Sequence, residues 1–186
     1  MFNVRYGFME FKAQVMNKEA MGRTLKRIAH EILERNKGGE ELCFVGIHSR
    51  GVPISKRLAL NIKEIEGADI PCGSLNITLY RDDVEGLTDI PVLMDSYIPF
   101  DVKDKRIVLI DDVIYTGRTA RAAMDALISR GRPASIQLVA FVDRGHRELP
   151  IKPDYVGKNI PTSKTETVAV RIEEIDGTDC VDIYEK

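Results

Sequence analysis

Hydrophobic residues recur along the chain at two spacings, one typical of helices and one typical of strands. The longest helical pattern covers residues 17–36, where Asn17 is a candidate N-cap and the two glycines at 38–39 end the pattern. Its apolar positions are Met21, Leu25, Ile28, Ala29, Ile32 and Leu33. This spacing predicts a helix that buries one face and leaves the other to solvent.

Short apolar or alternating runs predict strands, and further helices lie between them. Strands are expected at residues 42–47, 73–80, 106–111, 135–143, 167–175 and 180–185. Helices are expected over residues 53–65, with Pro53 in the first turn, and over residues 117–131, closed by Gly131. Strand and helix in alternation at these lengths predict an α/β fold with a doubly wound, mainly parallel sheet and flanking helices.

Two long connections do not fit this alternation. Residues 81–104 are acidic and interrupted by Pro91 and Pro99, and a connection of this length in a compact domain is usually functional or mobile. Residues 144–164 are basic and rich in turn-forming residues, so we expect them to form a cap beside the sheet. A single domain over residues 1–186 is therefore expected.

The composition is that of an ordinary globular protein. Among 186 residues, 44% are hydrophobic and 30% are charged, and the net charge of −2 does not draw the chain towards nucleic acid as a whole. The cysteines Cys43, Cys72 and Cys180 form no metal-ligand spacing, and their scatter fits a reducing cytoplasm. No apolar run approaches the roughly 18 residues that span a bilayer, and the start has no secretion signal, so we expect no membrane association.

The stretch VLIDDVIYTGRT, at 108–119, carries the candidate chemistry. Asp111 and Asp112 follow a buried strand, and ligands of open α/β sheets bind outside the carboxyl ends of strands. The next turn opens a helix and offers backbone N–H groups, two hydroxyls and a guanidinium to a phosphate, at the positive end of the helix dipole. These phosphate-binding candidates are Tyr115, Thr116, Gly117, Arg118 and Thr119.

The two carboxylates suit a sugar phosphate, because they accept hydrogen bonds from ribose hydroxyls and stabilise positive charge on the ring. A Walker loop and GxGxxG are both absent, which argues against an NTPase. HSRG, at 48–51, follows the first apolar strand, and its amides with Arg50 suit a diphosphate. From these residues alone, an acidic strand end before a capped helix and an ordinary turn remain open as alternatives.

Several stretches resemble known families. The segment IVLIDDVIYTGRT resembles the motif by which type I phosphoribosyltransferases bind 5-phosphoribosyl 1-diphosphate (PRPP). Four further stretches resemble, in the same order, stretches of the PyrR family of bifunctional pyrimidine operon attenuators and uracil phosphoribosyltransferases. They are RTLKRIAHEI, ITLYRDD, GRPASIQLVAFVDRGHRELPI and DYVGKNIPTSK. The likeness runs from about Phe11 to the C-terminus, and residues 1–10 form an extension without a clear counterpart. It implies the type I phosphoribosyltransferase fold, with a flexible lid loop at 81–104 and a small cap, or hood, at 144–164.

The implied reaction joins uracil to PRPP and gives UMP and diphosphate, with Mg²⁺ as the cofactor. Asp111 and Asp112 are then catalytic because positive charge develops on the ribose, and Arg81 of the lid reaches the diphosphate on closure. Mg²⁺ would be held by PRPP, water and these two Asp residues rather than by a dedicated protein cage. The predicted PRPP- and nucleotide-binding residues are Ser49, Arg50, Asp111, Asp112, Val113, Ile114, Tyr115, Thr116, Gly117, Arg118, Thr119 and Arg144. Seen alone, YRDD around Arg81 is equally consistent with a solvated strand end.

Two basic regions are candidate RNA-binding surfaces. The residues alone favour ordinary solvated faces, because any surface helix carries charges opposite its apolar stripe. The resemblance implies instead that pyrimidine operon leader mRNA binds there, as suits a ligand recognised by phosphates, shape and unstacked bases. The predicted RNA-binding residues are Arg27, His30, Arg35, His146, Arg147, Lys152 and Lys158.

Three hypotheses follow. The first is an RNA-binding attenuator that responds to UMP or UTP and retains uracil phosphoribosyltransferase activity. The second is a phosphoribosyltransferase for another base, such as hypoxanthine or orotate, without an RNA role, and the third is a regulator that has lost catalysis. The DRGHRELP and NIPTS motifs favour the first over the second, and the intact acidic pair with Arg50 and Arg81 argues against the third. We also expect a cytoplasmic homo-oligomer, a dimer or a tetramer, and His48 departs from the family pattern without an assigned role.

Overall fold

Two sheets make up the structure, a computed structural model that describes residues 9–77 and 96–186. The five-stranded sheet is parallel throughout, in the order β3-β2-β4-β5-β6. Its strands are β2 (Leu42–Ile47), β3 (Cys72–Leu75), β4 (Arg106–Ile114), β5 (Ser135–Asp143) and β6 (Tyr155–Asn159). The predicted α/β fold with a doubly wound parallel sheet is therefore confirmed.

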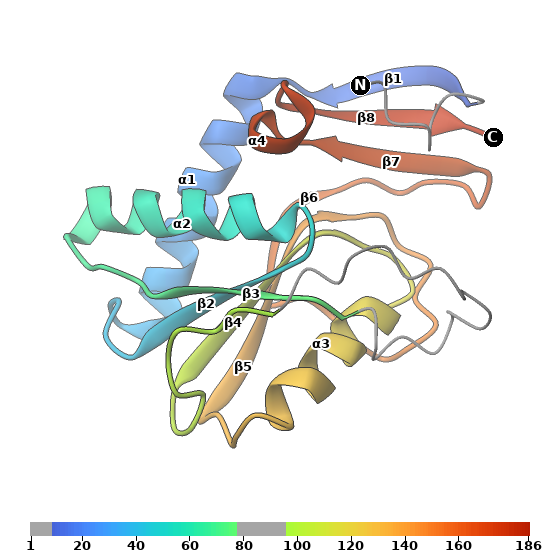
Figure 1. The fold of residues 1–186 in the computed structure, drawn as a ribbon. Coiled ribbons are helices and arrows are strands. Elements are labelled where there is room, and N and C mark those ends of the chain that lie inside the picture. The colour runs from blue at the N-terminus through green and yellow to red at the C-terminus, as the bar shows by residue number, and fades with distance from the viewer. Residues whose placement is uncertain (1–8, 78–95) are drawn as a thin grey trace.

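The second sheet is antiparallel and has the order β1-β8-β7. It consists of β1 (Glu10–Met16), β7 (Glu166–Arg171) and β8 (Cys180–Glu185). Figure 1 shows this sheet above the carboxyl ends of the five parallel strands, so that it covers the edge where ligands of α/β sheets bind. The short helix α4 (Glu173–Asp176) connects β7 to β8.

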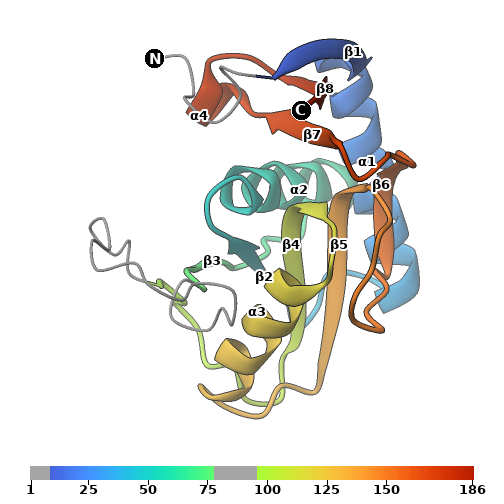
Figure 2. The same cartoon turned by 90° about the vertical axis from the view of Figure 1, so that its right-hand side faces the viewer.

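Helices cover both faces of the five-stranded sheet (Figure 2). The helices α1 (Lys18–Asn36) and α2 (Gly51–Glu66) pack on one face, and α3 (Arg118–Ile128) packs on the other. Side chains alternate between the two resulting cores: Phe44 and Val108 face α1 and α2, whereas Val45 and Leu109 face α3. Strands buried on both faces explain the uninterrupted apolar runs in the sequence. Within the described residues, no helix is long and apolar enough to cross a membrane.

The α1 prediction agrees closely with the structure. Asn17 is the N-cap, and its side-chain oxygen accepts a hydrogen bond from the N–H of Ala20 at 2.9 Å. The helix ends at Asn36, and its C-cap, Lys37, adopts the left-handed conformation one residue before the predicted glycines. All six predicted apolar positions are buried.

The strand predicted over residues 73–80 is shorter in the structure. β3 ends at Leu75, because it is an edge strand whose partner β2 ends at Ile47, the residue that pairs with Leu75. Residues 78–80 lie outside the described part of the chain. The register of a neighbouring strand, rather than the local alternation, sets this boundary.

The helix predicted over residues 117–131 also ends earlier. α3 stops at Ile128, because the N–H groups of Arg130 and Gly131 bond to carbonyls three residues back, which closes the helix with tight turns. Gly131 therefore does not close the helix itself.

The region 144–164, predicted to be a cap beside the sheet, contains the strand β6. It joins the five-stranded sheet through the register Val139↔Tyr155, because the edge of β5 would otherwise lack a partner. Likewise the strand predicted over 167–175 ends at Arg171, and α4 follows, since the carboxylate of Asp176 accepts a hydrogen bond from the N–H of Ile172 and closes a helical turn. β1 was not predicted, because local patterning does not indicate it. Its antiparallel pairing with β8 explains why this segment forms a strand.

Candidate active site

The turn between β2 and α2 lies directly against the end of β4. A Cβ on Gly51 would come within 2.2 Å of the carbonyl oxygen of Ile110, so only glycine permits this approach. The chain order reverses here, because β3 lies on one side of β2 and β4 on the other. The structure therefore brings Ser49 and Arg50 to Asp111 at the topological switch point of the sheet, where ligands of α/β folds bind.

The two carboxylates lie within β4 rather than after it. β4 extends to Ile114 because β5 pairs with it along its whole length, whereas its pairing with β2 stops at Ile110. Asp111 is buried and its Oδ1 accepts a hydrogen bond from the N–H of Asp112 at 3.1 Å. Burial raises the pKa of the Asp112 carboxyl, and the nearby positive charge of Arg50 acts against this shift.

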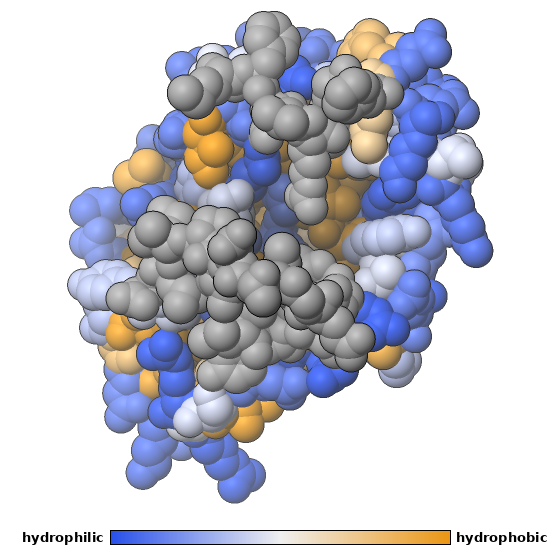
Figure 3. All heavy atoms as spheres, turned by 45° about the vertical axis from the view of Figure 1, so that its right-hand side comes forward, coloured by the Kyte–Doolittle hydropathy of each residue, from blue (hydrophilic) through white to orange (hydrophobic). Residues whose placement is uncertain are grey.

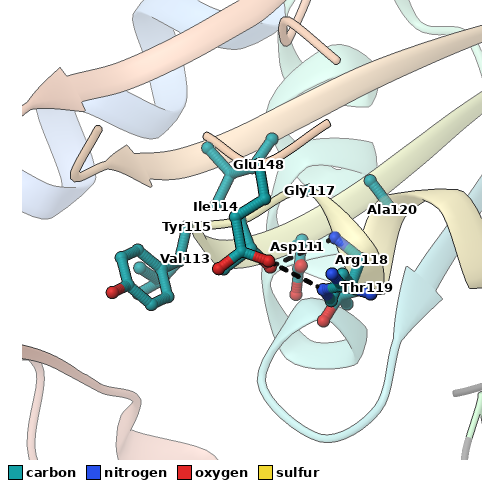
Figure 4. Close-up of a pocket in the computed structure, with 10 residues that line it drawn as sticks. Asp111, Val113, Ile114, Tyr115, Gly117, Arg118, Thr119, Ala120 and Glu148 are labelled. Carbon is teal, nitrogen blue, oxygen red and sulfur yellow. Dashed lines mark hydrogen bonds and ion pairs between the residues drawn. The ribbon is translucent and has the colours of Figure 1, made fainter. Parts of the chain in front are cut away.

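A pocket of about 350 Å³ lies over the start of α3 (Figure 4). The lining residues are Asp111, Val113, Ile114, Tyr115, Thr116, Gly117, Arg118, Thr119, Ala120 and Glu148. Gly117 is the N-cap of α3 with φ +93° and has no side chain to cap the helix, although the hydroxyl of Thr116 accepts a hydrogen bond from the N–H of Arg118 at 3.3 Å. The positive end of α3 lies at the pocket. All the residues predicted from 113 to 119 are thus brought together with Asp111.

The segment after β5 closes one side of this pocket. The N–H groups of Glu148 and Leu149 both donate to the carbonyl of Thr116, at 3.0 and 3.1 Å. Glu148 also accepts a hydrogen bond from Arg118 Nε at 2.9 Å, as Figure 4 shows. Sequence reasoning missed Glu148 as a pocket residue, because thirty positions separate it from Arg118.

Arg144 is buried beside the pocket. Its guanidinium lies 4.2 Å from the ring centroid of Tyr115, a cation–π contact. It also donates to the carbonyls of Ser163 and Glu166, at 3.3 and 2.7 Å, and so ties the end of β5 to the second sheet. A direct contact between Arg144 and a nucleotide stays a prediction.

Arg50 is held by a carboxylate that the sequence analysis did not single out. Asp176 of α4 accepts hydrogen bonds from Arg50 Nε at 3.0 Å and from Nη2 at 2.7 Å. The acidic run around Asp176 was visible in the sequence, but 126 positions separate the two residues. Arg81, predicted to be catalytic, and residues 81–95 of the predicted lid lie outside the described residues.

His48, at the start of the turn between β2 and α2, is half-buried. Its Nε2 is buried without a hydrogen-bond partner among the described residues, and burial lowers the pKa of the imidazole. Burial of the ring therefore favours its neutral form.

The predicted RNA-binding residues fall into two groups. The first lies on α1, which packs against β6: Arg27 donates to the carbonyls of Val156 and Gly157, at 3.0 and 2.7 Å, and Arg35 pairs with Asp154 at 2.7 Å. His30 is exposed on the same helix, and Lys158 is exposed on β6. The helix and the edge strand thus form one continuous surface, although part of its arginine charge is already paired.

The second group lies near the pocket. Arg147 donates to the carbonyls of Ile151 and Tyr115, both at 2.9 Å, and pairs with Asp143 at 2.6 Å. The ring of His146 contacts the carbonyl of Thr162. These side chains anchor the segment after β5, and Lys152 is exposed on it. For both groups an RNA contact stays a prediction.

Protein ligands for a metal are few. Nowhere in 9–77 or 96–186 do three or more His, Cys, Asp or Glu side chains gather in a group that could hold a metal ion. The carboxylates of Asp111 and Asp112 are adjacent, and hard oxygen donors of this kind suit Mg²⁺ that shares its coordination with a phosphorylated ligand and water.

Comparisons with known proteins converge on one family. The phosphoribosyl transferase domain family matches residues 13–175. A bifunctional protein PyrR from Thermus aquaticus is 58% identical over 178 residues, covering 96% of this chain and 98% of its own length. Its namesake from Deinococcus radiodurans is 54% identical over 174 residues, with coverages of 94% and 95%.

A hypoxanthine phosphoribosyltransferase structure from Trypanosoma cruzi superposes with a TM-score of 0.72 at 16% identity, covering 94% of this chain and 97% of that one. One from Staphylococcus aureus gives 0.71 at 19% identity, with coverages of 95% and 92%. At such identities the structural likeness bears on the fold alone.

Proposed function

Because this chain belongs to the phosphoribosyl transferase domain family and, within it, to the PyrR family of bifunctional proteins, we propose that it has two activities. It transfers the phosphoribosyl group of PRPP to uracil, which gives UMP and diphosphate. It also binds the leader mRNA of pyrimidine operons and regulates their transcription by attenuation, in response to a uridine nucleotide.

One observation carries the enzymatic proposal. The N-cap residues of α2 and α3 make no side-chain hydrogen bond to their helices, and both helices begin shortly after strands that flank the switch point. Each helix N-terminus can bind an anion, and the two carboxylates of β4 lie between the two N-termini. PRPP has the matching order of groups: a diphosphate for Ser49 and Arg50, a ribose for the carboxylates, and a 5′-phosphate for residues 116–119.

The carboxylates of Asp111 and Asp112 would then act on the ribose. Their oxygens accept hydrogen bonds from the ribose hydroxyls and orient the ring for attack at C1 by the base. As diphosphate departs, positive charge develops on the ring, and a carboxylate in a low-dielectric site stabilises that charge more strongly than water does.

Mg²⁺ fits this site as a shared ion. Asp111 and Asp112 would hold it together with oxygens of PRPP, and when bound it neutralises charge on the departing diphosphate. The segment after β5 would orient the phosphate loop, since Arg147 and the N–H groups at 148–149 bind the carbonyls of Tyr115 and Thr116.

The same segment offers a route between the two activities. A nucleotide phosphate over the start of α3 contacts the loop on which residues 145–151 are anchored. Occupancy of the pocket would therefore change the freedom of a segment that carries predicted RNA-binding side chains. By linkage, RNA must strengthen nucleotide binding by the same factor as the nucleotide strengthens RNA binding.

A nucleobase panel tests the enzymatic activity. PRPP and Mg²⁺ are incubated with uracil, hypoxanthine, guanine or orotate in turn, and the nucleotide and diphosphate formed are measured. Uracil should give the highest kcat/KM. A higher kcat/KM with another base, or no nucleotide from any base, would contradict the proposal.

Leader RNA tests the regulatory activity. The affinity for a pyrimidine operon leader hairpin is measured with and without UMP, at two salt concentrations, against a control hairpin of the same length and base composition. Binding should be selective for the leader and tighter with UMP. Equal affinity for both hairpins, unaffected by UMP, would contradict the regulatory activity and leave only the enzymatic one.

A further inference from the structure

Arg50 is locked by a partner from the second sheet. Both oxygens of Asp176 accept hydrogen bonds from the Nε–Nη2 edge of its guanidinium, so the pair is bidentate. The side chains of Arg50 and Asp176 are only 15% and 11% exposed, which limits competition from water. Two points of attachment determine the plane of the guanidinium as well as its position.

Asp176 is itself held in place. Its Oδ2 accepts a hydrogen bond from the N–H of Ile172 at 2.9 Å, and Ile172 is fully buried in the core shared by both sheets. A further arginine, Arg57 of α2, binds Glu174 of the same turn and Asp179 just beyond it. The α4 turn is therefore attached to α2 at two places, of which one includes Arg50.

We infer that Asp176 is a positioning residue for the diphosphate-binding arginine: it orients Arg50 towards the anion site between β2 and β4. This inference rests on the proposed function, in which Arg50 binds the diphosphate of PRPP. A free arginine side chain would lose rotamer entropy when it binds the diphosphate, whereas Arg50 is already ordered by Asp176. The local sequence around either residue does not indicate this pairing, because the two residues meet only in the folded chain.

The sign of the effect distinguishes positioning from simple electrostatics. Removing a negative charge beside an anion site should, by Coulomb attraction alone, strengthen anion binding. Loss of orientation should weaken it instead, and residues that orient the ligands of a metal ion, a comparable case, contribute about 10- to 100-fold in affinity or activity. The two effects predict opposite changes for the same substitution.

Asp176→Asn is the test variant. Asn keeps the shape and one oxygen for the N–H of Ile172, but it loses the charged bidentate contact with Arg50. We expect the Kd values for inorganic diphosphate and for PRPP, measured by calorimetry, to rise about tenfold. The KM for PRPP should rise in parallel, whereas the KM for uracil should change little.

Two further variants control for structural damage. Glu174→Gln weakens the neighbouring ion pair in the same turn without touching Arg50, and it should leave both Kd values unchanged. Asp176→Glu retains the carboxylate and should restore part of the lost affinity. Thermal unfolding of all three variants shows whether the turn remains folded.

The inference is overturned if Asp176→Asn binds diphosphate as tightly as wild type or more tightly, or if Glu174→Gln causes an equal loss. Calorimetry with diphosphate needs no turnover, so this result does not depend on the enzymatic assay. A wild-type protein that forms no UMP would contradict the proposed function, and an unchanged diphosphate affinity in Asp176→Asn would contradict only the role of Asp176.

Discussion

Burial disfavours the ionised form of the Asp112 carboxyl, and the neighbouring Arg50 partly offsets this effect. Burial raises its pKa, while the charge of Arg50 and the N–H of Val113 favour the ionised form. A buried negative charge is costly unless a positive charge lies near it, and in the proposed reaction the ribosyl ring would supply one as its bond to diphosphate breaks.

Asp112→Asn should therefore lower kcat far more than it lowers stability. The change keeps the shape and removes the charge, and one such interaction is typically worth about 3–4 kcal/mol in the transition state. We expect kcat for UMP formation to fall by about two to three orders of magnitude, with a small change in the midpoint of thermal unfolding. Near wild-type turnover in the variant would remove the assigned role.

The elements that form the site are held together by close backbone contact. The N-terminus of α2 packs on β4 at Gly51, and it packs on β2 at Gly46, where a Cβ would lie 2.5 Å from the carbonyl oxygen of Gly51. Two glycines thus allow a helix start to lie directly on two adjacent strands. Without this approach the turn with Ser49 and Arg50 would not reach the carboxylates of β4.

Gly51→Ala should separate these elements. Its Cβ would overlap the carbonyl of Ile110, so backbone must shift, and we expect a loss of about 3 kcal/mol or more in unfolding free energy. Gly22→Ala on α1 is the matched control: its Cβ meets nothing within 4 Å, and helix propensity predicts a gain of about 0.5–1 kcal/mol. Denaturant unfolding measures both, and equal effects would contradict the packing argument.

The outer face of α1 allows a test of RNA binding that leaves the enzyme intact. Lys26→Gln removes an exposed charge beside Arg27, so leader binding should weaken and the slope of log affinity against log salt should fall by about 0.7–0.9. Arg27→Gln should weaken binding too, but it also deletes the hydrogen bonds to β6 and should lower stability.

Lys103→Gln, an exposed change just before β4, serves as the control for both α1 variants. UMP synthesis should be unchanged in all three. If Lys26→Gln and Arg27→Gln bind the leader as Lys103→Gln does, this face of α1 has no RNA role.

In the whole molecule, the second sheet and the five-stranded sheet share one core. Val170 and Val181 of the second sheet are buried in the same cluster as residues of α1 and α2. The surface between the two sheets is recessed, with hydrophilic and hydrophobic side chains at its floor (Figure 3). Ion pairs from Arg50 and Arg57 to the α4 region strengthen this attachment, and Asp179, which pairs with Arg57, is the most buried carboxylate among them. The position of the upper sheet over the site therefore depends on charge as well as on apolar packing.

This attachment should depend on pH. Burial raises the pKa of the Asp179 carboxyl, but the hydrogen bonds from Arg57 and from the N–H of Glu173 more than offset that effect, and the pKa lies below its usual 3.8. A carboxyl with a lowered pKa in the folded state stabilises the protein above its unfolded pKa. That contribution is lost as pH falls from about 3.8 through the folded value.

Asp179→Asn should lower the unfolding free energy at pH 7 by about 2–3 kcal/mol, below the range for a fully buried pair because Arg57 is partly exposed. The difference from wild type should shrink as pH falls below about 4. Asp69→Asn, in an exposed pair with Lys63, should change the free energy by under about 0.5 kcal/mol. A difference for Asp179→Asn that is constant between pH 3 and pH 7 would contradict the linkage.

The sequence by itself determined what short-range physics controls. Hydrophobic spacing predicted α1 and its cap, and the apolar runs predicted β2 and β4, because periodicity and burial are written in neighbouring residues. The family was recognisable from contiguous motifs, and the family comparisons confirm it. That residues 113–119 line one pocket at the start of α3 was also predictable, since a strand, a glycine turn and a helix start stand in one stretch.

Only the tertiary structure decided which distant groups meet. β1 pairs with β8 and β6 pairs with β5 because sheet edges need partners, and no local pattern names the partner. Asp176 binds Arg50, and Arg147 binds the carbonyl of Tyr115 in the loop before α3, through contacts that form only when the chain folds. Charge spacing in a sequence shows that an arginine is available, but whether it binds a ligand or a neighbouring carboxylate depends on which group the fold brings within hydrogen-bonding distance.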